Sequence, residues 1–141
     1  MAHLSFGQTN LDSLWQVWED TSEPDTNRLD AIFQYTWYGY LFSDPDSAFQ
    51  LSQLQYNFAK EVGEMRYMGD AVNIQGATFY IKAEYDQAIT KYSEAIIIFE
   101  KIDDKIGIAN GLTNIGNIHS LKGDYSNALD NFSRALQIRE E

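Results

Sequence analysis

The sequence predicts an all-α fold, a short right-handed solenoid of three helix pairs preceded by one short helix. The main support is an internal repeat, because residues 69–101 align with residues 109–141 without a gap and share eight of 33 residues. Within each unit, apolar residues recur every three or four positions, which is typical of amphipathic helices. Turn-forming residues divide each 40-residue unit into two such helices.

The front of the chain precedes the repeats. An i, i+3, i+4, i+7 apolar pattern predicts a leading helix at residues 11–20, which begins after a cap at Asn10 and covers the first helix pair. Residues 1–10 are expected to be a flexible start or a signal-peptide remnant, because small Gly7 follows a short apolar stretch. A signal remnant would place the protein in the periplasm or another extracytoplasmic compartment. Otherwise we expect a cytoplasmic protein.

Three helix pairs follow in one domain that spans residues 11–141. The expected pairs are 26–42 with 45–62, 66–82 with 85–101, and 106–122 with 125–140, in repeats at about 26–65, 66–105 and 106–141. In the first pair, Asp44 is expected to cap a helix whose first turn contains Pro45. In the third pair, Gly123 suits a left-handed helix end and Asp124 suits the cap of the next helix.

Composition excludes several classes of function. The chain has 141 residues, no Cys, two His and a formal net charge of −11. The absence of Cys excludes disulfides, thiol catalysis and Cys-ligated metals, and two His are too few for a multi-His metal site. The acidic charge disfavours nucleic acids, and no apolar run is long enough to insert into a membrane. We therefore expect no nucleic-acid partner and no membrane insertion.

The repeat units carry a family resemblance. The last unit reads large–large–small–aromatic and then alanine–aromatic, with His119 in the first aromatic slot: Leu112-x2-Ile115-Gly116-x2-His119, followed by Ala128-x3-Phe132. This pattern resembles the tetratricopeptide repeat. The resemblance is strong over residues 69–141 and weaker over 26–68, where Gly39 and Ser52 replace the usual aromatics. It implies stacked helix pairs whose first helices line a concave, peptide-binding groove.

The front half carries a narrower resemblance. The strings Leu11–Trp15, Pro24–Leu29 and Trp37–Ala48 are similar to the amino-terminal tetratricopeptide region of exported Bacteroidetes-type sensor proteins. In those bacterial proteins the array precedes an adenylate/guanylate cyclase or histidine kinase domain. The resemblance implies a scaffold or sensing segment in signal transduction, and it implies no catalytic activity of these 141 residues.

The repeat register implied by the resemblance identifies the side chains that face the groove. Three of them, Asn110, Asn114 and Asn117, recur at i, i+4, i+7, and an Asn amide both donates and accepts hydrogen bonds. The full set is Asn73, Tyr80, Asn110, Thr113, Asn114, Asn117, Ser120, Phe33, Trp37 and Tyr40. No Lys or Arg occupies these positions, which favours an internal, neutral or basic peptide segment as partner. Alternatively, the Asn side chains simply face solvent, and Phe33 and Trp37 pack beneath the leading helix.

Two alternative functions compete with peptide binding in the groove. Apolar residues near the end of the chain, such as Leu129 and Leu136, could form a homo-oligomer through the C-terminal repeat. Phe33, Trp37 and Tyr40 could instead form the aromatic pocket of a small-molecule receptor. No catalytic set, cofactor site or metal site is expected: His119 is interpreted as a core residue and the turn carboxylates as caps. Gly107 and Gly111 are interpreted as a linker feature.

Overall fold

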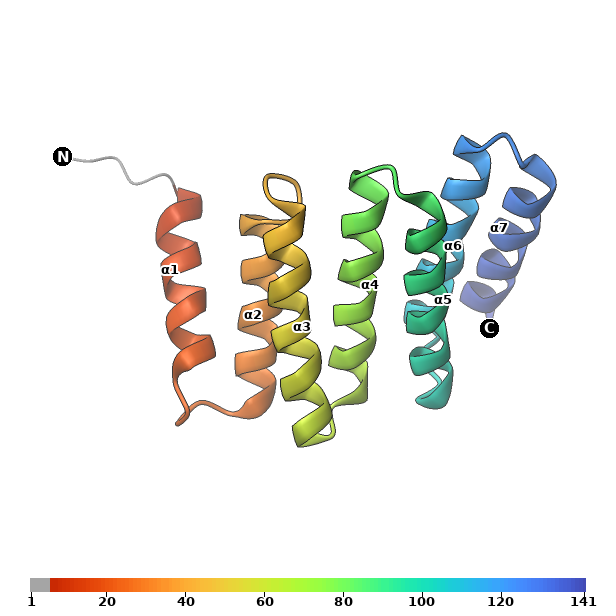
Figure 1. The fold of residues 1–141 in the computed structure, drawn as a ribbon. Helices are drawn as coiled ribbons and strands as arrows, with labels where there is room; N and C mark the ends of the chain where they lie inside the picture. Colours follow the sequence, from red (N-terminus) through yellow and green to blue (C-terminus); the bar gives the residue numbers. More distant parts are fainter. Residues whose placement is uncertain (1–5) are drawn as a thin grey trace.

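The computed structural model describes residues 6–141 as seven helices, with no strand among these residues. They are α1 (Phe6–Glu19), α2 (Asp25–Gly39), α3 (Pro45–Val62), α4 (Met65–Ile81), α5 (Tyr85–Lys101), α6 (Lys105–Leu121) and α7 (Tyr125–Glu140). The helices stand side by side in chain order, with α1 and α7 at opposite ends of the row (Figure 1). The predicted all-α solenoid is confirmed.

The turns form as their residues predict. Asp44 Oδ1 accepts a hydrogen bond from the Ser47 amide at 3.1 Å, and Pro45 occupies the first turn of α3. Asp124 caps α7 in the same way. Gly123 has a φ of +77°, the left-handed conformation that glycine adopts at little cost. The chemistry of the turns therefore sets where these helices begin and end.

Two helix boundaries differ from the prediction. α1 begins at Phe6, so Asn10 lies inside the helix rather than at its cap, and residues 1–5 lie outside the described part of the chain. α2 ends at Gly39, where we expected it to continue to residue 42. The amides of Tyr40 and Leu41 both donate to the Thr36 carbonyl, which closes the last turn early and buries Leu41.

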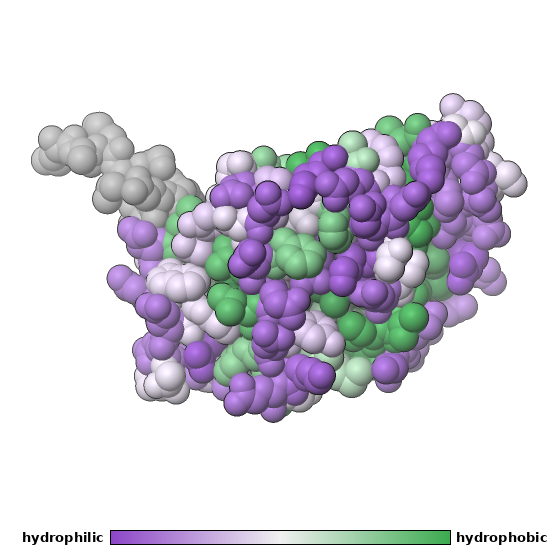
Figure 2. All heavy atoms as spheres, viewed as in Figure 1, coloured by the Kyte–Doolittle hydropathy of each residue, from purple (hydrophilic) through white to green (hydrophobic). Residues whose placement is uncertain are grey.

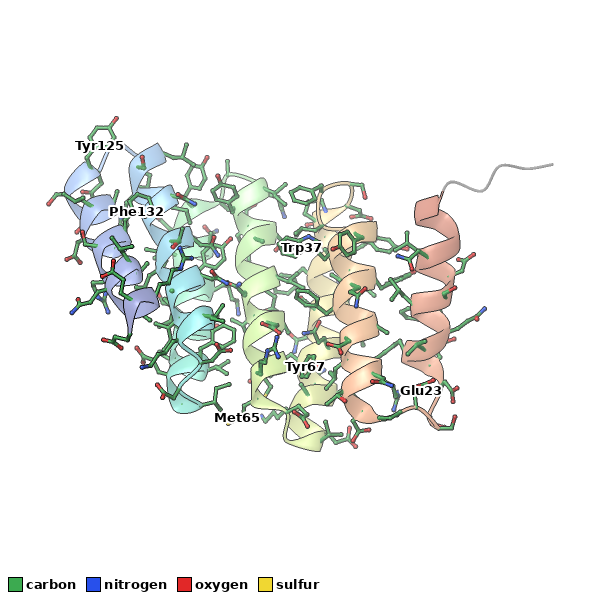
Figure 3. The ribbon with its side chains drawn as sticks, turned by 180° about the vertical axis from the view of Figure 1, so that it is seen from behind. Glu23, Trp37, Met65, Tyr67, Tyr125 and Phe132 are labelled. Atoms are coloured by element: carbon green, nitrogen blue, oxygen red, sulfur yellow. The ribbon has the colours of Figure 1, made fainter. Side chains whose placement is uncertain are left out.

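The helices form two layers. Cα atoms of α2 and α4, and of α4 and α6, approach within 8 Å, whereas those of α3, α5 and α7 do not approach one another so closely among residues 6–141. The row therefore curves toward α2, α4 and α6, which form its concave side, as the resemblance implied. The view from behind looks onto these three helices (Figure 3).

Small residues allow the two helices of a pair to pack closely. A Cβ atom at Gly76 would lie 2.7 Å from Tyr92 Cδ1, and one at Gly116 would lie 2.7 Å from Phe132 Cε1. In the first pair the larger of the two residues lies on the first helix. Thr36 replaces the glycine there, and the smaller Ser52 replaces the aromatic residue of the second helix. In the second and third pairs, an aromatic ring of the second helix fills the space beside the glycine of the first.

Gly107 and Gly111 are packing residues, and their interpretation as a linker feature is wrong. A Cβ atom at Gly107 would lie 2.5 Å from Phe99 Cγ, and one at Gly69 would lie 2.6 Å from Phe99 Cε1. The Phe99 ring is thus held between a glycine of α4 and a glycine of α6. In the same manner, a Cβ atom at Gly111 would lie 2.5 Å from Ile96 Cγ1 of α5.

The leading helix α1 covers the first pair. Trp15 packs on Tyr35 of α2 with ring centroids 5.0 Å apart, and Leu11 lies against Gly39. Arg28 Nε donates to the Trp18 carbonyl at 2.9 Å. These contacts run along the face of α2 that would otherwise be exposed at this end of the row.

A replacement of Ala83 by glycine is expected to stabilise the protein by about 0.5–1 kcal/mol. Ala83 has a φ of +59° in the turn where the third pair has Gly123. In both turns the next amide donates to a carbonyl five residues back, at 2.9 and 2.8 Å. Urea unfolding of Ala83→Gly and of the reciprocal Gly123→Ala should show opposite changes in midpoint, and equal signs would contradict this explanation.

Candidate peptide-binding groove

The central part of the groove is a small polar cavity between α4, α5 and α6. Tyr80, Tyr92, Asn114 and Asn117 line a volume of about 110 Å³. Asn117 is exposed and Asn114 is half-buried. No hydrogen bond within residues 6–141 uses either of their carboxamides, so both remain available to a ligand. Three of the residues predicted for the groove thus come together here.

Two further predicted residues lie on the same helices. The Asn73 Oδ1 atom on α4 is buried and accepts no hydrogen bond from the described residues. The Thr113 hydroxyl on α6 donates to the Ala109 carbonyl at 2.9 Å, so its donor is already used. The unpaired Asn73 oxygen thus lies below the surface, and Asn73 lines neither groove cavity, whereas Thr113 offers only the lone pairs of its oxygen.

The N-terminal ends of α4 and α6 enclose a second, charged cavity of about 430 Å³. Its lining includes Arg66, Asp70, Asp104 and Asn110. Arg139 of α7 donates to Asn110 Oδ1 at 3.0 Å, so only the amide donors of Asn110 remain free. Although no basic residue occupies a predicted groove position, Arg66 and Arg139 both reach this end of the groove.

Asp70 has an unusual protonation equilibrium. The pKa of Asp70 is raised to about 6, chiefly by burial; the charge of Arg66 lowers it, and the nearby charges of Asp104 and Asp30 add to the rise. Asp30 accepts a hydrogen bond from the Tyr67 hydroxyl at 2.7 Å. Burial and this bond raise the pKa of Tyr67 to about 12. The carboxylates make this end of the groove receptive to a cation.

The aromatic residues predicted for α2 divide into core and surface. Phe33 packs against the buried cluster of Leu41, Ala48 and Ile74, and it stacks on Trp37 with ring centroids 6.0 Å apart. Trp37 remains 37% exposed near the C-terminal end of α2 (Figure 3). Trp37 is therefore the accessible member of this pair.

Tyr40 and Ser120 are not brought to the central cavity. Because α2 ends at Gly39, Tyr40 leaves the helical register and its hydroxyl lies 3.0 Å from that of Tyr35. It lines a separate cavity with Asp46 and other residues of α3. Ser120 is half-buried near the end of α6 and lines neither groove cavity.

Some site residues lie outside the predicted set. Tyr92 is buried, and its ring also borders the central cavity. Arg66 precedes Asp70 by four residues, and this i, i+4 spacing on one helix face is the signal that could have identified it.

The opposite face of the molecule also has a cavity. A volume of about 400 Å³ opens between α3 and α5, and its lining includes Val72, Gln75 and Ile97. Figure 2 shows hydrophobic atoms interspersed with hydrophilic ones on this face. This convex cavity is the main structural competitor of the groove.

The described residues form neither a metal site nor a membrane span. Among residues 6–141, no three His, Cys, Asp or Glu side chains are grouped to hold a metal ion. His119 Nδ1 lies 3.5 Å from Asp124 Oδ2 and is buried without a hydrogen bond. None of the seven described helices is long and apolar enough to cross a bilayer.

Comparisons with known proteins agree with this architecture. The family model described as tetratricopeptide repeat matches residues 69–141. The crystal structure of the tetratricopeptide domain of Arabidopsis FLU superimposes with a TM-score of 0.70 at 17% identity, covering 83% of this chain and 98% of that one. No curated protein gives a significant match. With about half of its length matched by the family model, the chain belongs to the tetratricopeptide repeat family.

Proposed function

We propose that this chain is a non-catalytic interaction module that binds an extended segment of a partner protein in the groove formed by α2, α4 and α6. Tetratricopeptide repeats generally mediate protein–protein interaction. One observation carries the proposal: the unbonded carboxamides of Asn114 and Asn117 border a polar cavity on the concave side. Isolated solvated asparagines would not require such a cavity.

The chemistry of the cavity suits a peptide backbone. Each carboxamide offers two N–H donors and one carbonyl acceptor, which match the C=O and N–H groups of an extended chain. Recognition of this kind depends little on the sequence of the peptide.

The charged cavity supplies the preference for a neutral or basic segment. Asp70 and Asp104 border it, and Asp30 contributes further negative charge. A Lys or Arg side chain of the peptide would be attracted to these carboxylates. Arg66 reduces this attraction and would repel a second cation placed beside it.

The test begins with a peptide selected from a random display library for binding to the intact protein. The double variant Asn114→Ala, Asn117→Ala should weaken its binding by about 1–3 kcal/mol, roughly a five- to 150-fold increase in Kd. The matched control is Asn57→Ala, which removes an exposed carboxamide from α3 on the other layer. Isothermal titration calorimetry gives the affinities, and circular dichroism checks that helicity is unchanged.

The control Asn57→Ala distinguishes an effect of the groove from the loss of any exposed carboxamide. A Kd that is unchanged in the double variant, or equally raised by Asn57→Ala, would contradict the assignment of the groove. An aromatic small-molecule receptor is less well supported, because the Tyr40 hydroxyl pairs with that of Tyr35 and Phe33 packs against the buried core.

The resemblance of the front half to bacterial sensor arrays extends the proposal. On the basis of this resemblance, the module would be the sensing or scaffold segment of a larger signalling protein. It would act outside the cytoplasm if residues 1–10 derive from a signal peptide, and in the cytoplasm otherwise. Expression of the natural gene with a reporter fusion tests the compartment.

A further inference from the structure

The convex cavity has a buried polar residue in its lining. α3 and α5 stand on either side of α4 (Figure 1), and Gln75 of α4 lines the cavity of about 400 Å³ that opens between them. The Gln75 side chain is 2% exposed. Its Nε2 atom donates to Gln53 Oε1 at 3.2 Å, whereas no hydrogen bond within residues 6–141 uses its own Oε1 atom. The deep part of the cavity therefore offers one carbonyl acceptor.

The packing of the repeats does not require a glutamine at this position. The equivalent residue of the next unit is Ile115, which is buried in the core. Burying an amide where an aliphatic side chain fits costs free energy unless its N–H and C=O groups both find partners. Within the described residues, Gln75 has a partner only for its Nε2 group. A ligand that donates a hydrogen bond to Oε1 would complete the pairing.

The walls of the cavity are apolar. Val72 is buried, Ile98 is half-buried, and Ile97 is 54% exposed although its side chain is aliphatic. In the next unit the exposed position is polar, because Gln137 corresponds to Ile97. Compared with that unit, the buried residue of the cavity is polar and the exposed one is apolar. This arrangement suits a ligand with an apolar body and a polar group that points inward.

The size and the charge of the cavity narrow the class of ligand. A volume of about 400 Å³ is within the range of small-molecule sites. Lys91 and Glu94 border the cavity and pair at 3.2 Å, so their charges largely cancel and favour neither an anion nor a cation. Tyr56 also lines the cavity, and an aromatic ring packs favourably with another ring. A neutral aromatic molecule therefore fits this lining better than an ion.

We propose that the convex cavity binds a small uncharged aromatic molecule with one N–H or O–H donor, the chemistry of an indole or a phenol. The ring contacts the apolar walls, and its N–H or O–H group donates to Gln75 Oε1. The site shares no residue with the groove, nor with Phe33, Trp37 and Tyr40 of the aromatic pocket considered on the first pair. The module would then combine peptide binding on its concave side with small-molecule binding on its convex side.

Indole is the probe, and nuclear magnetic resonance of the intact ¹⁵N-labelled protein measures its binding. Saturable shifts of the Gln75 side-chain amide and the Ile97 amide are expected. 1-Methylindole has the same ring without the donor and should bind roughly two- to tenfold more weakly. This difference should disappear in Gln75→Ile, because the acceptor is then absent. The next unit accommodates isoleucine at this position, so the variant should fold.

A second variant tests the apolar wall without a change in the core. Ile97→Gln introduces the residue that α7 has at the equivalent position, and it should weaken indole binding about threefold or more through the loss of apolar contact. The matched control is Leu121→Gln, which changes an exposed aliphatic residue of α6 outside the cavity lining. This control should leave the Kd for indole unchanged, and circular dichroism checks that each variant remains helical.

Shifts that do not saturate up to the solubility limit of indole, or equal Kd values for indole and 1-methylindole, would overturn the proposal. Binding of N-acetyltryptophan amide without binding of free indole would assign the cavity to a tryptophan side chain of a partner protein and would also overturn it. The Asn114→Ala, Asn117→Ala variant should bind indole normally, and Gln75→Ile should bind the selected peptide normally. The small-molecule site and the groove can therefore fail independently.

Discussion

Replacing Phe99 with alanine is expected to lower the free energy of unfolding by about 3–5 kcal/mol. Phe99 is buried, and its ring lies between Gly69 of α4 and Gly107 of α6. Removing the ring leaves a cavity lined by two glycines, whose missing side chains cannot fill it. The loss should therefore reach the upper part of the range for a core aromatic.

Urea unfolding followed by circular dichroism measures this effect. The matched control is Phe42→Ala, since Phe42 is an exposed aromatic and its removal leaves the core intact. The converse variant Gly107→Leu should also destabilise the protein, by about 1–3 kcal/mol, because its side chain would collide with the ring. Equal effects of Phe99→Ala and Phe42→Ala would contradict the role of the two glycines.

Replacing Asp70 with asparagine is expected to stabilise the protein at neutral pH by on the order of 2 kcal/mol. The pKa of Asp70 is raised from about 3.8 in the unfolded chain to about 6 in the folded state, chiefly by burial. The folded protein therefore binds the proton more tightly than the unfolded chain. Burial of the ionised carboxylate costs stability above pH 6, and this cost disappears as the pH falls toward 3.8.

Unfolding at several pH values between 3.5 and 7.5 tests this prediction. The stability difference between Asp70→Asn and the wild type should be largest above pH 6 and should vanish near pH 3.5. The control Asp130→Asn removes an exposed carboxylate of α7. A difference that does not change with pH would show that Asp70 is not desolvated in the folded protein.

Much of the fold could be predicted because it depends on local patterns. The 3.6-residue period identifies the helices, and the 40-residue repeat identifies which of them are equivalent. The repeat also explains why Lys82 and Lys122 are identical, since each pairs with the aspartate 36 residues earlier, at 2.8 and 2.9 Å. Contacts within and between neighbouring units follow from such spacing.

The site was predicted less completely, because it depends on where helices stop and on which side chains find internal partners. Tyr40 lies in register with Tyr80 by sequence, but α2 ends one residue before it. Asn110 follows the same spacing as Asn114, but its side-chain oxygen already accepts a hydrogen bond from Arg139 of another helix. The packing role of Gly107 was not predicted, because Phe99, whose ring lies against it, is outside the repeat motif that identified the other glycines.

The most direct test of the central claim is to locate a bound peptide by nuclear magnetic resonance. The amide and side-chain signals of ¹⁵N-labelled protein would be followed as the display-selected peptide is added. We expect the signals of Asn114, Asn117 and Tyr80 to shift, with smaller shifts near Asp70. Shifts confined to Val72, Gln75 and Ile97 would place the peptide in the convex cavity and would contradict the assignment of function to the concave groove.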